Sequence, residues 1–319
     1  MKKVVALRSA SSIAMLVIAA AAVPGAYAAG SVQARQQAAA SVAGGSPECK
    51  ALGDFYWEIG DASGVQGSGK IGSEYSANET IRIASASKFV FGAYFLEKIG
   101  RSAQPTADQL SYLEMRSGYA NFNPLMCMLS RSVDSCMTAR SNGDRDGSKV
   151  GRFSYGGGHD QKLAGMLGLG RMNAEEFGRE IKQYVGPEIG FSYKSPQPAG
   201  GMESSPADYG KFLRKIISGQ LRMKEFLGYQ PVCASTSCPG VAYTPVVDNW
   251  HYSINHWIED DPRTGDGAFS SPGAMGFYPW ISKDKTTYGV LARNKMGKTS
   301  YWDSVLCGRE IRKAWMSGG

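Results

Sequence analysis

The chain has 319 residues, of which 43% are hydrophobic and 20% charged, with a formal net charge of +7 at pH 7. This length allows one large domain or two small ones. The balance is only mildly basic, and no run of Lys and Arg with interleaved aromatic residues is present. The sequence therefore gives no reason to expect a nucleic-acid partner.

The first 28 residues have the three parts of an export signal. Lys2, Lys3 and Arg8 form a basic start, residues 13–23 are a short apolar run, and residues 26–28, Ala-Tyr-Ala, are a small-x-small cleavage site. The apolar run is too short to cross a bilayer comfortably, and no later segment reaches about 18 uninterrupted apolar residues. We expect a periplasmic or secreted protein without a membrane span after cleavage, and removal of the signal lowers the net charge from +7 to +4.

Six cysteines follow the cleavage site: Cys49, Cys127, Cys136, Cys233, Cys238 and Cys307. An even number in an oxidising compartment favours disulfides, although six cysteines allow 15 pairings. Two pairs, Cys127/Cys136 and Cys233/Cys238, are close enough to close local loops. The remaining two cysteines would then join the chain ends, in a loop worth roughly 4–5 kcal/mol. No spacing is Cys-x-x-Cys, which argues against zinc and thioredoxin-type chemistry.

The start of the mature chain predicts a leader and a hairpin. Residues 29–46 are rich in Ala, Gln, Gly and Ser and are expected to be a flexible leader. Residues 55–59 and 70–72 are predicted strands around a Gly-rich turn at 63–69. This turn resembles a phosphate-binding loop, but Ile71 stands where Ser or Thr is required, so nucleotide binding is not expected.

The next segment, residues 81–96, contains two candidate catalytic residues. Residues 81–84 form a strand-like apolar run and residues 89–96 a helical one, with Ser85 and Lys88 at their junction. Residues three apart share a helix face, so the amine and the hydroxyl can meet. A buried amine loses solvation, which favours its neutral form as the base that activates the serine. The alternative is a capping serine beside a solvated lysine.

Later segments predict helices at 106–118, 174–184, 204–217 and 305–315, and strands at 252–258, 273–281 and 287–294. The third of these helices has a serine cap and a proline in its first turn. This order predicts an α+β fold, with an antiparallel sheet flanked by helices and an inserted mostly helical domain. We expect a single domain at 47–319, with its α/β part at about 47–105 and 245–319 and its helical part at about 106–244.

Three segments resemble those of a known family. They are residues 82–88, Arg-Ile-Ala-Ser-Ala-Ser-Lys; residues 110–118, which end Met-Arg-Ser-Gly; and residues 198–202, Pro-Ala-Gly-Gly-Met, followed by Ser204, Ser205 and Asp208. The family is the serine β-lactamase and D,D-peptidase superfamily, especially its class C-type esterase and amidase branch, and the resemblance covers roughly residues 52–315. It implies a β-lactamase/D,D-peptidase-like fold and a serine hydrolase that forms an acyl-enzyme at Ser85.

The resemblance also implies a catalytic tyrosine, for which there are two candidates. Tyr119 begins a matching Tyr-x-Asn, but it directly follows the Ser-Gly helix end. Tyr155 lies in a Phe-x-Tyr run before residues 163–165, Leu-Ala-Gly, which is the expected context, so we predict Tyr155 and interpret Tyr119 as a packing residue. A nearby Lys88 cation favours the phenolate, and whether lysine or tyrosine is the base stays open. His159 is expected either to contact the substrate or to be a surface or cap histidine.

Residues 270–277, Ser-Ser-Pro-Gly-Ala-Met-Gly-Phe, resemble the Lys-Thr-Gly strand that lines the site in this family. Gly273 stands at the glycine, where a substrate can lie against the backbone. The backbone N–H groups of Ala274 and Ser85 would form the oxyanion hole, in which loss of one donor costs ~10²–10³ in rate.

At two positions the sequence departs from the family pattern in a way that affects substrate binding. Ser271 replaces the family's lysine, beside Pro272, and Gly157 replaces an asparagine that would hold an acylamide. Each lost hydrogen bond to a charged group is worth about 1.5–3 kcal/mol. We therefore expect a small ester, amide or peptide substrate in contact with Gly157, His159, Ser271 and Gly273. Arg293, Lys295 or Lys298 could restore the missing positive charge.

Two alternatives remain: a β-lactamase or D-alanyl-D-alanine carboxypeptidase, and a non-catalytic penicillin-binding-like recognition module. No cofactor and no metal is expected, because His159, His251 and His256 show no ligand spacing with carboxylates or cysteines.

Overall fold

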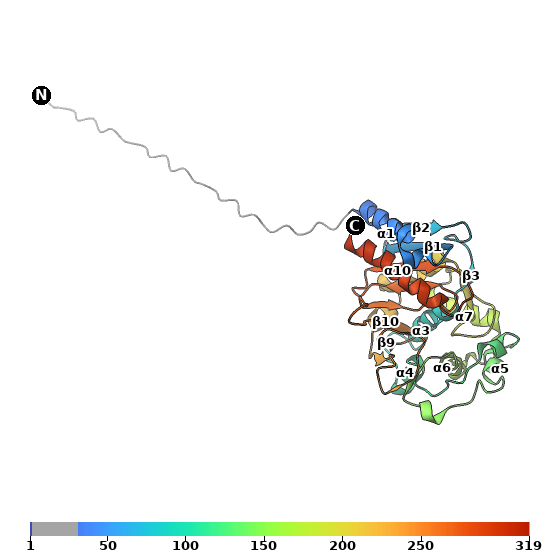
Figure 1. Ribbon diagram of the computed structural model, residues 1–319. Coiled ribbons are helices and arrows are strands. Elements are labelled where there is room, and N and C mark those ends of the chain that lie inside the picture. Colours follow the sequence, from blue (N-terminus) through green and yellow to red (C-terminus); the bar gives the residue numbers. More distant parts are fainter. Residues whose placement is uncertain (2–30, 319) are drawn as a thin grey trace.

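The computed structural model describes Met1 and residues 31–318 (Figure 1). The predicted export signal, apart from Met1, lies outside the described residues. Among the residues described, no helix combines the length and the apolar composition needed to cross a bilayer.

An eight-stranded antiparallel sheet forms the centre of the fold, in the order β2-β1-β13-β12-β11-β10-β9-β7. The central pairing joins the two ends of the chain, with Tyr56 opposite Ala292 and Trp57 opposite Leu291. The predicted antiparallel sheet, drawn from both chain ends, is confirmed. Its strands are β1 (Phe55–Asp61), β2 (Gly64–Ile71), β7 (Val232–Cys233), β9 (His251–Ser253), β10 (His256–Glu259), β11 (Ala268–Ser270), β12 (Tyr278–Ile281) and β13 (Thr287–Ala292).

Helices cover both faces of this sheet. The helices are α1 (Val32–Gly45), α2 (Pro47–Lys50), α3 (Ser87–Lys98), α4 (Ala107–Leu113), α5 (Val133–Met137), α6 (Gly158–Ala164), α7 (Ala174–Val185), α8 (Pro206–Ile217), α9 (Met223–Phe226) and α10 (Ser300–Ser317). Side chains alternate along β1. Phe55, Trp57 and Ile59 pack in the cluster that contains α1 and α10, whereas Tyr56 packs in the cluster that contains α3 and α8.

Short elements complete the chain. They are the two-stranded sheet of β4 (Phe153–Ser154) and β8 (Val241–Tyr243), the three-stranded sheet of β3 (Ile81–Arg82), β6 (Met202–Ser204) and β5 (Ser192–Tyr193), and the turns η1 (Ala84–Ala86), η2 (Pro124–Cys127), η3 (Gly147–Lys149) and η4 (Gly165–Leu169). Helices α4, α5 and α6 lie at the end of the molecule opposite α1 and α10 (Figure 1).

The prediction of a flexible leader at residues 29–46 is wrong over most of its length, because α1 is a helix that packs on α10 (Figure 1). Ser31 caps it by accepting a hydrogen bond from the Ala34 N–H. Ala39 and Ala43 are buried, since their small side chains allow close packing. Alanine has the highest helix propensity, and the composition that suggested flexibility in fact supports this helix.

Three disulfides join Cys49 to Cys307, Cys127 to Cys136, and Cys233 to Cys238. They are the two local loops and the end-to-end link that the spacing favoured among its 15 possible pairings. The first disulfide ties α2 to α10 and so holds both chain ends on one face of the sheet.

Element boundaries differ from expectation in several places. The predicted Gly-rich turn at 63–69 is mostly part of strand β2, which begins at Gly64 and pairs with β1. The predicted helix at 106–118 ends at Leu113, and the predicted strand at 273–281 begins only at Tyr278. Residues 252–258 form a hairpin instead of one strand, because Asn255 adopts a left-handed backbone (φ 59°) that reverses the chain. In addition, β7 and α8 pack with the sheet, although both fall within the predicted helical part.

Candidate active site

Ser85 lies on a tight turn that precedes a buried helix. Turn η1 holds it between β3 and α3, and the residue before it, Ala84, has φ 46°, which is a strained left-handed conformation for a non-glycine residue. The Ser87 hydroxyl donates to the Ala84 carbonyl (2.6 Å), and the Tyr209 hydroxyl donates to the Ala86 carbonyl (2.8 Å). These bonds fix the strained turn and so fix the position of Ser85.

Lys88 lies beside Ser85, as the spacing of three residues predicts. Its Nζ donates to Ser85 Oγ at 3.1 Å and to the Ala199 carbonyl at 3.0 Å. The side chain is only 3% exposed, so the amine is shielded from water and its hydrogen bonds hold it in one place. A solvated lysine, which was the alternative interpretation, does not fit this geometry.

Tyr155 is the tyrosine that reaches this lysine. Lys88 Nζ lies 4.8 Å from the centroid of the Tyr155 ring. Tyr155 directly follows β4 in the chain. Its ring packs on the rings of Trp257 (5.1 Å between centroids) and Tyr252 (6.0 Å between centroids). Ser85, Lys88 and Tyr155 are therefore neighbours in the structure, although Tyr155 is 70 residues from Ser85 in sequence.

Tyr119 lies in a different environment. Its ring stacks on Tyr112 (6.1 Å between centroids), and the cation nearest its face is Lys162, at 5.6 Å from the centroid. These contacts are those of a packing residue, in agreement with the interpretation of Tyr119 from its sequence context.

The Gly273 segment abuts the turn that carries Ser85. A Cβ at Gly273 would lie 2.1 Å from the Ile83 carbonyl oxygen, so only glycine fits there. Residues Gly273 to Gly276 form a turn between β11 and β12, closed by the hydrogen bond from the Gly276 N–H to the Gly273 carbonyl (2.8 Å). Ala274 is exposed on this turn.

Ser271 forms a hydrogen bond to the backbone of Ser85. The residue is 2% exposed, and its hydroxyl donates to the Ser85 carbonyl at 3.0 Å. The hydroxyl proton is therefore already used within the protein, where it holds the backbone of Ser85. The contact between Ser271 and a substrate stays a prediction.

His159 lies inside the protein and not at its surface. The imidazole is fully buried, with Nδ1 2.7 Å from Ser117 Oγ and Nε2 2.9 Å from the Ser154 carbonyl. A carbonyl can only accept, so Nε2 carries the proton and Nδ1 accepts from the serine. Burial, together with a smaller effect of the Lys88 cation, lowers the pKa of His159 to about 4. The interpretation of His159 as a surface histidine is therefore wrong, and the predicted contact with a substrate stays a prediction for this neutral, buried imidazole.

Gly157 has an aromatic neighbour that the sequence did not reveal. A Cβ at Gly157 would lie 2.9 Å from two ring atoms of Phe122 and 3.3 Å from Ala199 Cβ. A longer side chain therefore has no room unless the Phe122 ring moves. An apolar ring fills the space beside the position where the resemblance leads one to expect a polar amide.

The three basic residues proposed to restore a positive charge are not equivalent. Arg293 is 3% exposed and donates to Ser304 Oγ and to the carbonyls of Leu52 and Ser300, so it is unavailable to a substrate. Lys295 and Lys298 are exposed, and the Lys295 N–H donates to the Met275 carbonyl at 2.9 Å, beside the Gly273 turn. Only these two lysines remain candidates.

Comparison with known proteins adds evidence on the fold. No protein-family model and no curated protein matches the sequence. Among solved structures, the chain is similar to a β-lactamase from Mycobacterium bovis (15% identity, 87% of this chain and 99% of that chain, TM-score 0.54). It is also similar to EstCE1, a hydrolase with promiscuous acyltransferase activity (12% identity, 89% of this chain and 99% of that chain, TM-score 0.62). A third similar structure is a D-stereospecific amidohydrolase from Streptomyces (14% identity, 86% of this chain and 98% of that chain, TM-score 0.57).

The chain adopts the β-lactamase fold. The alignments cover 98–99% of these three chains and 86–89% of this one, so the likeness concerns most of the described body and not one motif. At 12–15% identity the likeness concerns the fold alone, so the chemistry has to be argued from the residues of this chain.

Two cavities in the described part of the chain lie away from Ser85. One, of about 540 Å³, is lined by residues around the β10–β11 hairpin, and the other, of about 240 Å³, lies between α5 and α6. Neither lining combines a nucleophile with a base. Their lining residues include Asp260, Asp266 and Lys283 in the first, and Asp134, Lys162 and Met166 in the second.

Sequence reasoning missed three residues around Lys88 and Gly157. The Ala199 carbonyl lies in the Ala-Gly-Gly segment, which the resemblance singled out without giving it a role. Phe122 follows Tyr119 by three residues and carried no motif. Asp160 is a fully buried carboxyl in α6, and its only signal was a charge in an otherwise uncharged stretch of Gly and His.

Proposed function

We propose that the protein is an exported serine hydrolase that forms an acyl-enzyme at Ser85 with small esters or amides. The observation that carries this proposal is the 3.1 Å contact between Lys88 Nζ and Ser85 Oγ, with the Tyr155 ring on the same amine. A hydroxyl becomes a nucleophile when a neighbouring base takes its proton, and both candidate bases are present.

The reaction follows from this arrangement. Ser85 Oγ attacks the substrate carbonyl while its proton passes to the base, either Lys88 or Tyr155. The N–H groups of Ser85 and Ala274 stabilise the oxyanion. The intermediate collapses as the leaving group takes the proton, and a water molecule then attacks the acyl-enzyme with the same groups acting in reverse.

The surroundings of the site support an apolar substrate over a β-lactam. Phe122 fills the space beside Gly157, the Ser271 hydroxyl is bonded to Ser85, and Arg293 is buried in other hydrogen bonds. The side chains at the family's own carboxylate and acylamide positions are thus missing or already in use, and only the exposed Lys295 and Lys298 remain to hold a carboxylate. The similarity to the hydrolase EstCE1 and to a D-stereospecific amidohydrolase is consistent with this choice.

The test is turnover of two substrates by purified protein: a short-chain nitrophenyl ester and a labelled penicillin. We expect ester hydrolysis, lowered by on the order of 10⁴-fold or more in Ser85→Ala. The matched control is Ser218→Ala, on an exposed serine at the end of α8, which should leave the rate unchanged.

Each other outcome has a meaning. Full ester turnover by Ser85→Ala contradicts the nucleophile assignment, and rapid penicillin turnover contradicts the substrate class. A folded protein that reacts with neither compound supports a non-catalytic recognition module instead. Export is tested separately, by determining the N-terminal residue of the secreted chain. Cleavage after Ala28 leaves Ala29 as that residue.

A further inference from the structure

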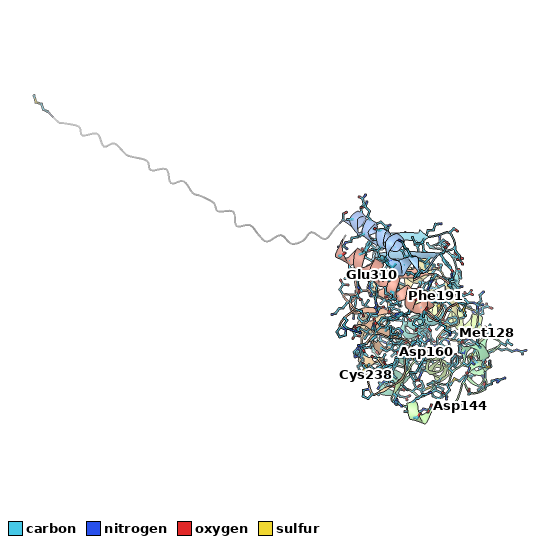
Figure 2. The ribbon with its side chains drawn as sticks, viewed as in Figure 1. Met128, Asp144, Asp160, Phe191, Cys238 and Glu310 are labelled. Carbon is cyan, nitrogen blue, oxygen red and sulfur yellow. A yellow bond between two sulfur atoms is a disulfide. The ribbon has the colours of Figure 1, made fainter. Side chains whose placement is uncertain are left out.

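A buried carboxyl lies behind the proposed site and has no part in the chemistry described so far. Asp160, near the start of α6, is fully buried and lies toward the middle of the folded body (Figure 2). Its Oδ1 accepts a hydrogen bond from Asn255 Nδ2 at 2.9 Å. Its Oδ2 has no hydrogen-bond partner among the described residues. A buried carboxyl with one bonded oxygen is a poor place for a negative charge.

The polar groups around Asp160 share this lack of partners within the described part of the chain. Asn255 Oδ1 and the hydroxyls of Tyr193 and Tyr252 are buried without a hydrogen-bond partner. The charge of Asp160 raises the pKa of both tyrosines, in addition to the larger effect of their burial. Buried polar groups are normally hydrogen-bonded, so an under-satisfied cluster requires an explanation, and a role in catalysis is one such explanation.

The cation that acts on this carboxyl is Lys88. Burial raises the pKa of Asp160 to about 7, and the Lys88 charge and the Asn255 hydrogen bond oppose that rise. The cation of the proposed catalytic amine therefore favours the ionised form of this carboxyl, and Tyr252, on which Asp160 acts, packs on the Tyr155 ring at 6.0 Å between centroids. At neutral pH Asp160 is divided between its neutral and its ionised form.

The other titratable groups near Asp160 are neutral, paired or exposed. Tyr193 faces it from β5 and Tyr252 from β9, while neutral His159 precedes it on α6. On the helices that pack against α6, Glu114 at the end of α4 is paired with Arg116, and Asp134 on α5 is exposed. Lys88 is left as the charged group that couples to Asp160.

We propose that Asp160 is a positioning residue that acts through Lys88 and Tyr155, and that its charge sets the pH at which Ser85 becomes reactive. This proposal rests on the proposed function. An ionised Asp160 opposes loss of a proton from the lysine or from the tyrosine, whereas a neutral Asp160 does not. Both candidate bases respond in the same direction, so the inference holds whichever of them activates Ser85.

The experiment measures the rate at which a fluorophosphonate labels Ser85, as a function of pH, in the wild type and in Asp160→Asn. Asparagine keeps the shape and removes the charge. We expect the midpoint of the profile to move to lower pH by about one unit, so that labelling on its rising limb is about tenfold faster in the variant. The control is Asp144→Asn, in an exposed loop (Figure 2), and it should leave the profile unchanged.

The outcomes separate this inference from the proposed function. If the wild type is not labelled at Ser85, the proposed function fails. If the wild type is labelled and Asp160→Asn shows the same midpoint, only the role of Asp160 fails, because a merely structural residue changes the rate without moving the midpoint.

If Asp160→Asn does not fold, aspartate-selective ¹³C labelling of the wild type gives the answer. A carboxyl signal that titrates near pH 7 and shifts on Ser85 labelling supports the role of Asp160. The absence of such a signal overturns it.

Discussion

Lys88 Nζ lies 3.1 Å from Ser85 Oγ, and the two residues are joined by a single turn at the start of α3. The contact is local, so it forms whenever the turn and the helix form. The strained backbone at Ala84 and the buried body of α3 hold both side chains in place. The remaining parts of the proposed site, by contrast, depend on how distant segments pack.

Replacement of Tyr155 by Phe tests which tyrosine serves the reaction. We expect Tyr155→Phe to lower the kcat for the nitrophenyl ester by ~10²–10⁴, since it removes the hydroxyl that exchanges protons with Ser85 and keeps the ring that packs on Trp257. Tyr119→Phe is the matched control and should keep nearly full activity. A large loss in Tyr119→Phe with full activity in Tyr155→Phe would mean that the assignment is reversed.

Gly273→Ala tests the close approach beside the nucleophile. The added Cβ would lie 2.1 Å from the Ile83 carbonyl oxygen, so the backbone of the Ser85 turn has to move. We expect kcat/KM to fall by about 10² or more, because small misplacements of reacting atoms cost that much. Gly147→Ala, at a glycine with no atom within 4 Å of the new Cβ, should be neutral. Equal activity of the two variants would contradict the account of this segment.

The end-to-end disulfide should contribute more stability than the shortest local one. Cys49 and Cys307 are 258 residues apart, whereas Cys233 and Cys238 are separated by only 5. In the loop-entropy model, removal of the long link costs about 5 kcal/mol and removal of the short one about 2 kcal/mol. Urea unfolding of the two double Cys→Ala variants measures this difference, and similar losses in both would show that loop entropy does not decide it.

Two buried histidines predict acid sensitivity. Burial lowers the pKa of His159 and of His256 to about 4, from 6.5 in the unfolded chain. His256 accepts from the Gly228 N–H and donates to the Ile254 carbonyl, so it too is neutral. Between these pH values the unfolded chain binds more protons, and stability therefore falls as the pH falls through this window.

A single substitution isolates this effect. In His256→Gln, which cannot be protonated, the loss of unfolding free energy between about pH 7 and pH 4.5 should be smaller than in the wild type by about 2–3 kcal/mol. Parallel stability curves for the two proteins would show that His256 does not contribute in the way described.

The sequence predicts features that depend on near neighbours. The spacing of Ser85 and Lys88, the serine cap and proline that begin α8, and the two short disulfide loops all need only a few residues of context. The chain-end sheet was also predictable, since alternating strands without helices between them pair as antiparallel hairpins.

Other features depend on contacts that no local pattern contains. The Ala199 carbonyl reaches Lys88 across 111 residues, and Phe122 fills the space beside Gly157 only after the chain has folded. The sequence does not predict the burial of His159, because its two partners, Ser117 and Ser154, carry no motif. Helix α1 was missed because its alanines have a partner only once α10 is in place.

The most direct measurement is the mass-spectrometric location of a fluorophosphonate adduct on the purified protein. The account predicts one adduct, on the peptide that contains Ser85, which is absent in Ser85→Ala and strongly slowed in Lys88→Met, where the amine 3.1 Å from the hydroxyl is removed. An adduct on another serine, or labelling that persists in Ser85→Ala, would contradict the central claim that Ser85 is the nucleophile.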